Sequence, residues 1–314
     1  MTPHASNLRK RLLQGLLPGL RLLPPRLASR MVARLGQAEF WFHPALRHSV
    51  IDAVEQAAQR IEADWNARTT ARRLIGNTLR WHARDKLLDG LTDRQVATVL
   101  DVHGQEHLDS AYRANRGVVL LFNHFGPFLM PAHWLVRQGY PLRWFTERPR
   151  HISKLVARTF STEGPLGQRD LFISRRLTPS EGGAAIRKAV RMLQAGMIVQ
   201  LAGDVRWSGV RCAPGRFLGR DYQFTTTWVS LAGRTGAPVV PAFAVMRRDG
   251  TYHIEFLPPL VVPREATGCP EVATRWVQHN LSNIEEWVRR FPENSGDYFF
   301  WNEQPAETPV PAAA

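Results

Sequence analysis

The stretch that decides the fold is "GVVLLFNHFGPFLMPAHWL", residues Gly117 to Leu135. It opens with a continuous apolar run of the length of a buried strand. The run ends at an Asn and a His, and Gly126 and Pro127 separate it from the apolar residues that follow. A buried strand that ends in a polar loop is a common way to build an active site. His124 is therefore the first candidate for a functional side chain.

Similar apolar runs alternate with helical patterns along the rest of the chain. Strands are predicted at residues 117–123, 141–147, 197–204, 237–247 and 251–262. Amphipathic helices are predicted at residues 181–196, 225–236 and 272–292. Strands that alternate with helices favour an α/β fold, in which crossover connections build the sheet.

The N-terminal part of the chain has a different pattern. From Pro44 to about Val102 the apolar spacing predicts helices, and Gly90 is placed to end the second of them. We therefore divide the chain into a basic amphipathic segment (1–43), a helical region (44–102), an α/β domain (103–303) and a disordered tail rich in Pro and Ala (304–314).

The net charge of +14 indicates an anionic partner, either nucleic acid, an acidic membrane surface, or an acidic carrier or substrate. The first acid of the chain is Glu39, and the basic residues before it alternate with leucines that share one helical face. This pattern predicts a segment that lies in the plane of an anionic membrane, with an ordinary packed helix as the alternative. Arg21 and several prolines interrupt its apolar run, which argues against a signal peptide or a spanning helix.

Cysteine usage indicates the redox compartment. Cys212 and Cys269 are too few for a disulfide framework or a cysteine-rich metal site, so a reducing compartment fits best.

Four blocks of the sequence resemble the lysophospholipid acyltransferase superfamily, and most closely its lipid A biosynthesis late acyltransferase branch. The blocks are "NRGVVLLFNHFGPFLM" (115–130), "RKAVRMLQAGMIVQLAGD" (187–204), "GRFLGRDYQFTTTWVSLAGRTGAPVVP" (215–241) and "EFLPPL" (255–260). The resemblance implies a mixed sheet flanked by helices, with an N-terminal helical region. It also implies a peripheral protein at the cytoplasmic face of the inner membrane.

In activity, the resemblance implies that an acyl group moves from a thioester donor to a hydroxyl or amine acceptor such as a lipid. The donor is an acyl carrier protein or coenzyme A, which is a co-substrate, so no cofactor is expected. In this family a His is followed five residues later by Asp or Glu, and that acid orients the imidazole as it takes the acceptor's proton. His124 matches the base, but Leu129 stands at the position of the acid.

Three accounts of the missing acid are open. In the first, Asp204, at the end of a predicted strand where the family also tends to carry Asp, replaces it in space. In the second, a backbone carbonyl orients His124, and the acceptor is a stronger nucleophile such as an amine or hydroxylamine. In the third, the chain is a non-catalytic relative that binds acyl chains or lipids.

The resemblance also implies residues that bind substrate. Arg148 matches an Arg-Pro that follows the second strand, where a guanidinium can hold a phosphate with two hydrogen bonds. Arg216 and Gly219 match a block that helps to bind a phosphate or head group, and Arg206 belongs at the same rim. Asn123 reaches the pocket or caps its own turn. For each arginine, a solvated surface position is the alternative.

Two other patterns are set aside. "HGQEH" (103–107) matches the H-x-x-E-H pattern of a class of zinc peptidases, but Gly104 weakens the helix that this chemistry needs, so we expect no metal. Nucleic-acid binding rests on charge alone, because no base-reading motif is present. The one exception is a tRNA partner, since an aminoacyl-tRNA could serve as donor to a small amine acceptor.

Overall fold

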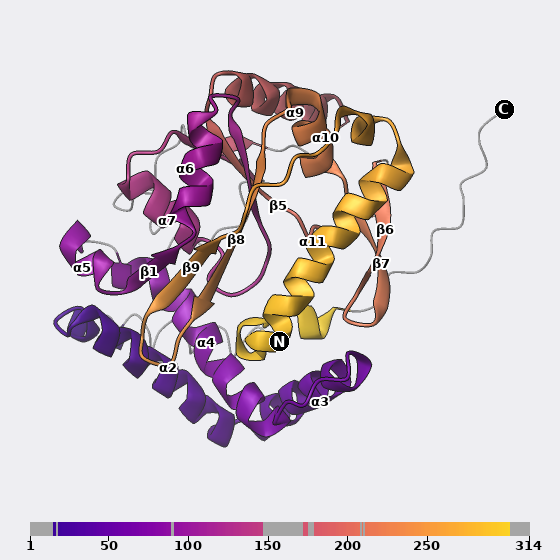
Figure 1. Cartoon of the computed structure of the whole chain (residues 1–314). Helices are drawn as coiled ribbons and strands as arrows, with labels where there is room; N and C mark the ends of the chain where they lie inside the picture. Colours follow the sequence, from indigo (N-terminus) through magenta and orange to yellow (C-terminus); the bar gives the residue numbers. More distant parts are fainter. Residues whose placement is uncertain are drawn as a thin grey trace.

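The computed structural model of the chain describes residues 15–16, 18–88, 91–146, 172–174, 179–207, 209 and 211–301, and every structural statement below concerns these residues. Arg148 and the tail from residue 304 lie outside them. The described residues confirm the predicted α/β fold. Helices flank a mixed sheet of seven strands, and a two-stranded sheet lies beside it (Figure 1).

Central strand β2 (Val118–Phe122) organises the large sheet. The other strands of this sheet are β1 (Leu100–His103), β3 (Leu142–Thr146), β4 (Phe172–Ser174), β5 (Ile198–Ala202), β8 (Val239–Met246) and β9 (Tyr252–Phe256). Their order is β1-β9-β8-β2-β5-β3-β4. Both neighbours of β2 run parallel to it, whereas β9 is antiparallel to β8. Every residue of β2 and β8 is buried, which explains why the sequence shows continuous apolar runs there.

Helices cover both faces of the sheet. They are α2 (Pro25–Phe42), α3 (Pro44–Arg60), α4 (Ala67–Leu88), α5 (Asp93–Ala97), α6 (Gln105–Arg113), α7 (Met130–Arg137), α9 (Pro179–Gln194), α10 (Thr227–Thr235) and α11 (Pro270–Arg290). Short 3-10 turns follow as η2 (Arg264–Thr267), η3 (Pro292–Asn294) and η4 (Tyr298–Phe300).

The two faces of β2 belong to two hydrophobic clusters. Val119 and Leu121 join a cluster with apolar residues of α9, α10 and α11. Val118 and Leu120 join another with apolar residues of α6 and α7. This alternation follows from the period of two in a strand, and it places the sheet between two helical layers.

The structure differs from the predicted elements in two places. β1 begins at Leu100, inside the range for which the sequence predicts helix. The second sheet, formed by β6 (Cys212–Phe217) and β7 (Arg220–Thr225), is an antiparallel hairpin that the apolar pattern does not predict. Its turn consists of Leu218 and Gly219, both with positive φ (48° and 75°), as in the two-residue turns that match the twist of hairpins.

The N-terminal helices pack onto the rest of the protein. Val32 and Phe40 of α2 are buried, and Gly36 lies so close to Gly76 of α4 that a Cβ there would be 2.8 Å from the Gly76 Cα atom. Apolar residues of α3 and α4 belong to the same cluster as α10 and α11. Among the described residues, no helix is both long and apolar enough to cross a membrane.

Candidate active site

The parallel register of β2 and β5 brings His124 opposite Asp204. Phe122 pairs with Ala202 at the ends of the two strands, and the Gly203 amide donates to the Phe122 carbonyl at 2.8 Å, so the pairing continues past the last strand residues. His124 and Asp204 each lie two residues beyond a strand end. Two residues that are 80 positions apart in the chain therefore leave the same edge of the sheet side by side. The carboxyl ends of parallel strands are where α/β proteins usually bind ligands.

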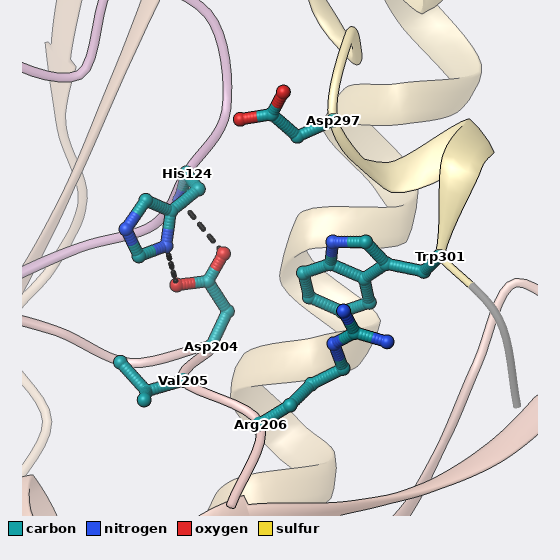
Figure 2. A pocket seen from close by; sticks show the side chains of 6 residues that line it. All are labelled: His124, Asp204, Val205, Arg206, Asp297 and Trp301. Carbon is teal, nitrogen blue, oxygen red and sulfur yellow. Dashed lines mark hydrogen bonds and ion pairs between the residues drawn. The ribbon is translucent and has the colours of Figure 1, made fainter. Parts of the chain in front are cut away.

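Asp204 holds both the ring and the backbone of His124 (Figure 2). Its Oδ1 lies 2.8 Å from His124 Nδ1, and its Oδ2 accepts a hydrogen bond from the His124 amide at 2.7 Å. The Tyr298 hydroxyl donates to the same Oδ2 at 2.6 Å. Because an ionised carboxylate only accepts hydrogen bonds, Nδ1 is the protonated nitrogen of a neutral His124 and Nε2 keeps its lone pair.

The exposure of the two side chains suits different tasks. The Asp204 side chain is 0% exposed, so its charge depends on the hydrogen bonds that it accepts, whereas the His124 side chain is 37% exposed. A buried acid that orients a partly exposed imidazole is the arrangement found in His-acid pairs that move protons.

The pair also shifts the pKa values of its members. Burial by itself lowers the pKa of His124, but the charge and hydrogen bond of Asp204 outweigh it, with a further contribution from Asp297, so the pKa of His124 is raised. Burial raises the pKa of Asp204, but the charge and hydrogen bonds of His124 and the Tyr298 hydroxyl lower it below its ordinary value. Burial, together with the charge of Asp204, keeps the pKa of Tyr298 well above its ordinary value, so that its hydroxyl stays a donor.

A cavity of about 480 Å³ opens at the pair. Its lining consists of His124, Asp204, Val205, Arg206, Asp297 and Trp301 (Figure 2). The Arg206 guanidinium lies over the Trp301 ring, 4.4 Å from its centroid, and Asp297 is exposed. The cavity thus presents a cation and an anion around one imidazole.

An aromatic wall lies beside the imidazole. The Phe128 ring is edge-on to His124 at 5.1 Å between centroids, and Phe122 stacks on Phe128 at 5.2 Å. Trp81 of α4 contacts Phe128 at 4.7 Å. The partly exposed Phe128 thus adds an apolar ring beside a cavity that is lined by charged residues as well as by Val205 and Trp301.

Leu129 cannot be replaced by an acid without cost. It is 5% exposed and packs in the apolar cluster of α6 and α7, directly before α7 begins at Met130. The side chain at the position of the family's acid thus faces the core, and the carboxylate next to His124 comes from the neighbouring strand end. Of the three accounts of the missing acid, the geometry agrees with the first.

The other predicted binding residues lie in different places. Arg206 lines the cavity, apart from Arg216 and Gly219, with which it was predicted to share a rim. Asn123 is buried, and its side chain exchanges hydrogen bonds with Asn280 of α11, the shorter at 3.0 Å, which ties that helix to β2. Neither Arg216 nor Gly219 is among the described residues that line the cavity.

Arg216 and Gly219 have local roles in the β6–β7 hairpin. The Arg216 side chain is 67% exposed and lies 3.6 Å from Asp221, and its backbone pairs with Gln278 of α11. Gly219 occupies the turn against Arg60. The sequence block that contains them therefore shapes the hairpin and its packing on α11.

Sequence reasoning missed Val205, which follows Asp204, and three residues near the end of the chain. Asp297, Tyr298 and Trp301 belong to or flank the η4 turn, which follows α11 back to the edge of the sheet. The only signal in the sequence was an acid among aromatic residues after the last amphipathic helix. That composition also suits a packed terminus, so it did not distinguish a site.

The fold and the site define the class: an α/β protein with a hydrogen-bonded His–Asp pair, at an open cavity beyond the carboxyl ends of two parallel strands. A profile described as bacterial lipid A biosynthesis acyltransferase matches residues 4–302, nearly the whole chain, and the chain belongs to this family. No curated protein matches the chain. Family membership supports transferase activity in general, with acyl transfer to a lipid as the reaction that the family suggests.

Proposed function

We propose that the protein transfers an acyl group from a thioester donor, an acyl carrier protein or coenzyme A, to a hydroxyl or amine of a lipid acceptor. His124 acts as the general base. The observation that supports this most directly is the buried Asp204 carboxylate at 2.8 Å from His124 Nδ1, within the range of a strong hydrogen bond.

The reaction proceeds by addition and elimination. The acceptor oxygen or nitrogen attacks the thioester carbonyl carbon while its proton moves to His124 Nε2. The tetrahedral intermediate then collapses, the carbon–sulfur bond breaks, and the imidazolium returns the proton to the leaving thiolate. The products are an ester or amide and a free thiol, so the imidazole ends as it began.

Asp204 and Tyr298 are positioning residues in this scheme. Asp204 fixes the ring and the tautomer of His124, and it stabilises the imidazolium that forms during attack. The Tyr298 hydroxyl, from the η4 turn near the end of the chain, donates a hydrogen bond to the second oxygen of Asp204. This hydrogen bond fixes the rotamer of the carboxylate.

The rest of the cavity supplies contacts for the donor. Both donors carry a phosphopantetheine arm, whose phosphate suits the Arg206 guanidinium at the rim. The Phe128 ring, which is partly exposed beside His124 and backed by the buried Phe122, suits an acyl chain next to the reacting carbon. No cofactor has a part in this chemistry.

Asp297 favours amines as a second class of acceptor. Its exposed carboxylate lines the cavity with His124, where it can hold an ammonium group before that group loses its proton. A lipid hydroxyl gains nothing from a nearby anion. With an amine acceptor, Asp297 therefore binds the acceptor in addition to raising the pKa of His124.

Helix α2 supports a peripheral location at an anionic membrane, for which we propose the cytoplasmic face of the inner membrane. Leu27, Met31 and Leu35 recur every four residues and are 40%, 39% and 43% exposed, on the side away from the buried residues that contact α4. Exposed arginines, Arg30 and Arg34, lie among them. Apolar side chains interleaved with basic ones are typical of helices that lie in a membrane interface.

The test compares His124→Ala with His279→Ala, a substitution at an exposed histidine of α11. Each purified protein is given acyl carrier protein or coenzyme A thioesters and lipid acceptors, and products are identified by mass spectrometry. Lipids from cells with and without the gene are compared in parallel. We expect His124→Ala to lose transfer and His279→Ala to keep it.

Two results would overturn the proposal. Unchanged transfer by His124→Ala would show that His124 is not the general base. Absence of transfer by the wild type with any donor, together with tight binding of acyl chains, would identify a non-catalytic lipid-binding relative. Transfer that requires an aminoacyl-tRNA would instead show that the donor is an aminoacyl-tRNA and not a thioester.

A further inference from the structure

A second group of titratable side chains lies on one face of the sheet edge. In the parallel pair of β1 and β9, Asp101 is opposite His253 and His103 is opposite Glu255. Residues two apart in a strand point to the same face, so all four side chains share it. None of them is among the described residues that line the His124 cavity.

Three of these residues bring their ligand atoms together. Asp101 Oδ1 lies 2.8 Å from His103 Nε2, and Asp101 Oδ2 lies 3.3 Å from His253 Nδ1. The three potential ligand atoms lie within 4.8 Å of one another. The sequence predicts no metal at the "HGQEH" pattern that contains His103, but Asp101 and His253 come from outside that pattern. We infer that Asp101, His103 and His253 form a binding site for a divalent transition metal ion such as Zn²⁺, separate from the acyl-transfer site.

The distances suit this chemistry with small movements. Ligand atoms at about 2.0–2.1 Å from a tetrahedral zinc are about 3.4 Å apart. The spacing of Asp101 Oδ2 and His253 Nδ1 already matches, and His103 Nε2, which contacts the other oxygen, Oδ1, must turn toward Oδ2 to complete the set. The His103 side chain is 51% exposed, so it can move, and water can reach the fourth position.

Glu255 prepares His253 for the role of ligand. Its Oε2 accepts a hydrogen bond from His253 Nε2 at 2.8 Å, which places the ring proton on Nε2 and leaves the lone pair of Nδ1 facing Asp101. Histidines that bind metals usually donate their other nitrogen to a carboxylate or carbonyl in this way. Two imidazoles and one carboxylate favour zinc and its neighbours over Mg²⁺ or Ca²⁺, which prefer oxygen ligands.

The Arg247 guanidinium occupies the position that the metal ion would take in this group. Its Nη1 lies 2.5 Å from Asp101 Oδ2, and its Nη2 lies 2.8 Å from His253 Nδ1. The same two atoms would bind the metal, so the guanidinium must leave first. The Arg247 side chain is 43% exposed and can swing into solvent. The metal and Arg247 therefore compete for one site.

This competition makes the inference testable. The full-length protein, without an affinity tag and treated with EDTA, is titrated with Zn²⁺ by calorimetry, and the thermal midpoint is followed with and without the ion. We expect saturable binding of one ion with a raised midpoint, because the ion joins the edge strand β1 to β9. His103→Ala should weaken binding on the order of tenfold or more.

Arg247→Gln should have the opposite effect and tighten Zn²⁺ binding, on the order of tenfold, because the competing cation is gone. His124→Ala and His279→Ala are the controls and should bind Zn²⁺ as the wild type does. Weak binding that His103→Ala leaves unchanged would overturn the inference, and so would weaker binding in Arg247→Gln. Loss of binding in His124→Ala would assign the ion to the acyl-transfer site instead.

Discussion

At the scale of single residues, the site depends on where one carboxylate comes from. The resemblance predicts an acid five residues after His124, but Leu129 occupies that position in the core, and Asp204 reaches His124 from the adjacent strand end. A carboxylate on either element can accept a hydrogen bond from Nδ1. The chemistry requires that a carboxylate oxygen lie at hydrogen-bond distance from Nδ1 and point toward it, whichever element carries the acid.

The first prediction concerns Asp204→Asn. The amide keeps the size of the side chain but loses the charge, and its NH₂ group can turn toward Nδ1 and favour the wrong tautomer of His124. In the serine-protease triad the equivalent change costs about four orders of magnitude in rate, and we expect a loss of several orders here. The measurement is kcat/KM, with circular dichroism to check folding, and Asp221→Asn on the exposed hairpin as the matched control. A loss of less than about tenfold would show that Asp204 does not orient the base.

The second prediction concerns pH. A general base must be neutral, so kcat/KM should rise with pH through the raised pKa of His124. Asp297→Asn removes a negative charge that helps to raise this pKa, so the rising limb should move to lower pH. With a hydroxyl acceptor the plateau should change little, because His124 is already neutral there and only its strength as a base is reduced.

The control is again Asp221→Asn, whose charge is on the surface of the hairpin. A limb that moves to higher pH in Asp297→Asn, or that moves equally in the control, would contradict the electrostatic account. A fall in the plateau that is confined to amine acceptors would support the acceptor role of Asp297.

At the scale of elements, the loop between β2 and α7 is held by backbone contacts. Gly126 has φ of +56°, its amide donates to the Asn294 carbonyl at 2.8 Å, and Asn294 Oδ1 accepts from the Met246 amide. This loop contains His124. The position of the base thus depends on the η3 turn after α11 as well as on its own strand.

The third prediction is that Gly126→Ala destabilises the protein more than Gly139→Ala. Both glycines have positive φ, so both substitutions strain the backbone by about 1–2 kcal/mol. A Cβ at Gly126 would also lie 2.2 Å from the Ala244 carbonyl oxygen, whereas Gly139 faces open space. Unfolding in denaturant measures the difference, which should exceed about 1 kcal/mol. Equal losses would mean that the loop moves freely away from β8.

At the scale of the whole molecule, the net charge of +14 and the exposed face of α2 both support the anionic membrane proposed above as a partner. The helix has two apolar sides: Val32 and Phe40 are buried, while Leu27 and Leu35 are exposed. Helix α2, which lies within the segment that the sequence predicts as a membrane anchor, is therefore also part of the packed structure. Deleting it would uncover apolar surface of α4, so substitutions on the exposed side are the cleaner test.

The fourth prediction is that replacing Leu27, Met31 and Leu35 together by Gln reduces binding to vesicles of anionic lipid by at least about tenfold. The midpoint of unfolding should change little, because these side chains are about 40% exposed and Gln is a good helix former. Sedimentation with vesicles gives the bound fraction. Raising the salt should weaken wild-type binding as well, since the arginines are screened.

Val261→Gln is the control, because Val261 is an exposed apolar residue away from α2, at 67%. Equal loss of binding in the control would point to general surface apolarity. Full binding by the triple variant at low and high salt would place the attachment outside α2.

Local pattern in the sequence was sufficient for several of the central strands. Strands buried on both faces are mostly apolar, so β2, β5 and β8 were predicted close to their observed bounds. His124 stood out because it follows such a run, in the loop after the strand end. The absence of an acid at Leu129 was also plain from the sequence, as was Asp204 as one of the ways to replace it.

Only the tertiary structure decided which side chains meet. The pairing of Phe122 with Ala202 brings Asp204 to His124, and the pairing of Asp101 with His253 builds the second cluster. Register between strands far apart in the chain follows from the packing of the whole sheet, and no short stretch of sequence encodes it. The same holds for Tyr298, whose hydroxyl reaches Asp204 only because α11 carries the end of the chain back across the sheet. Local sequence pattern thus determines which residues follow the end of a strand, and long-range packing determines which side chains they contact.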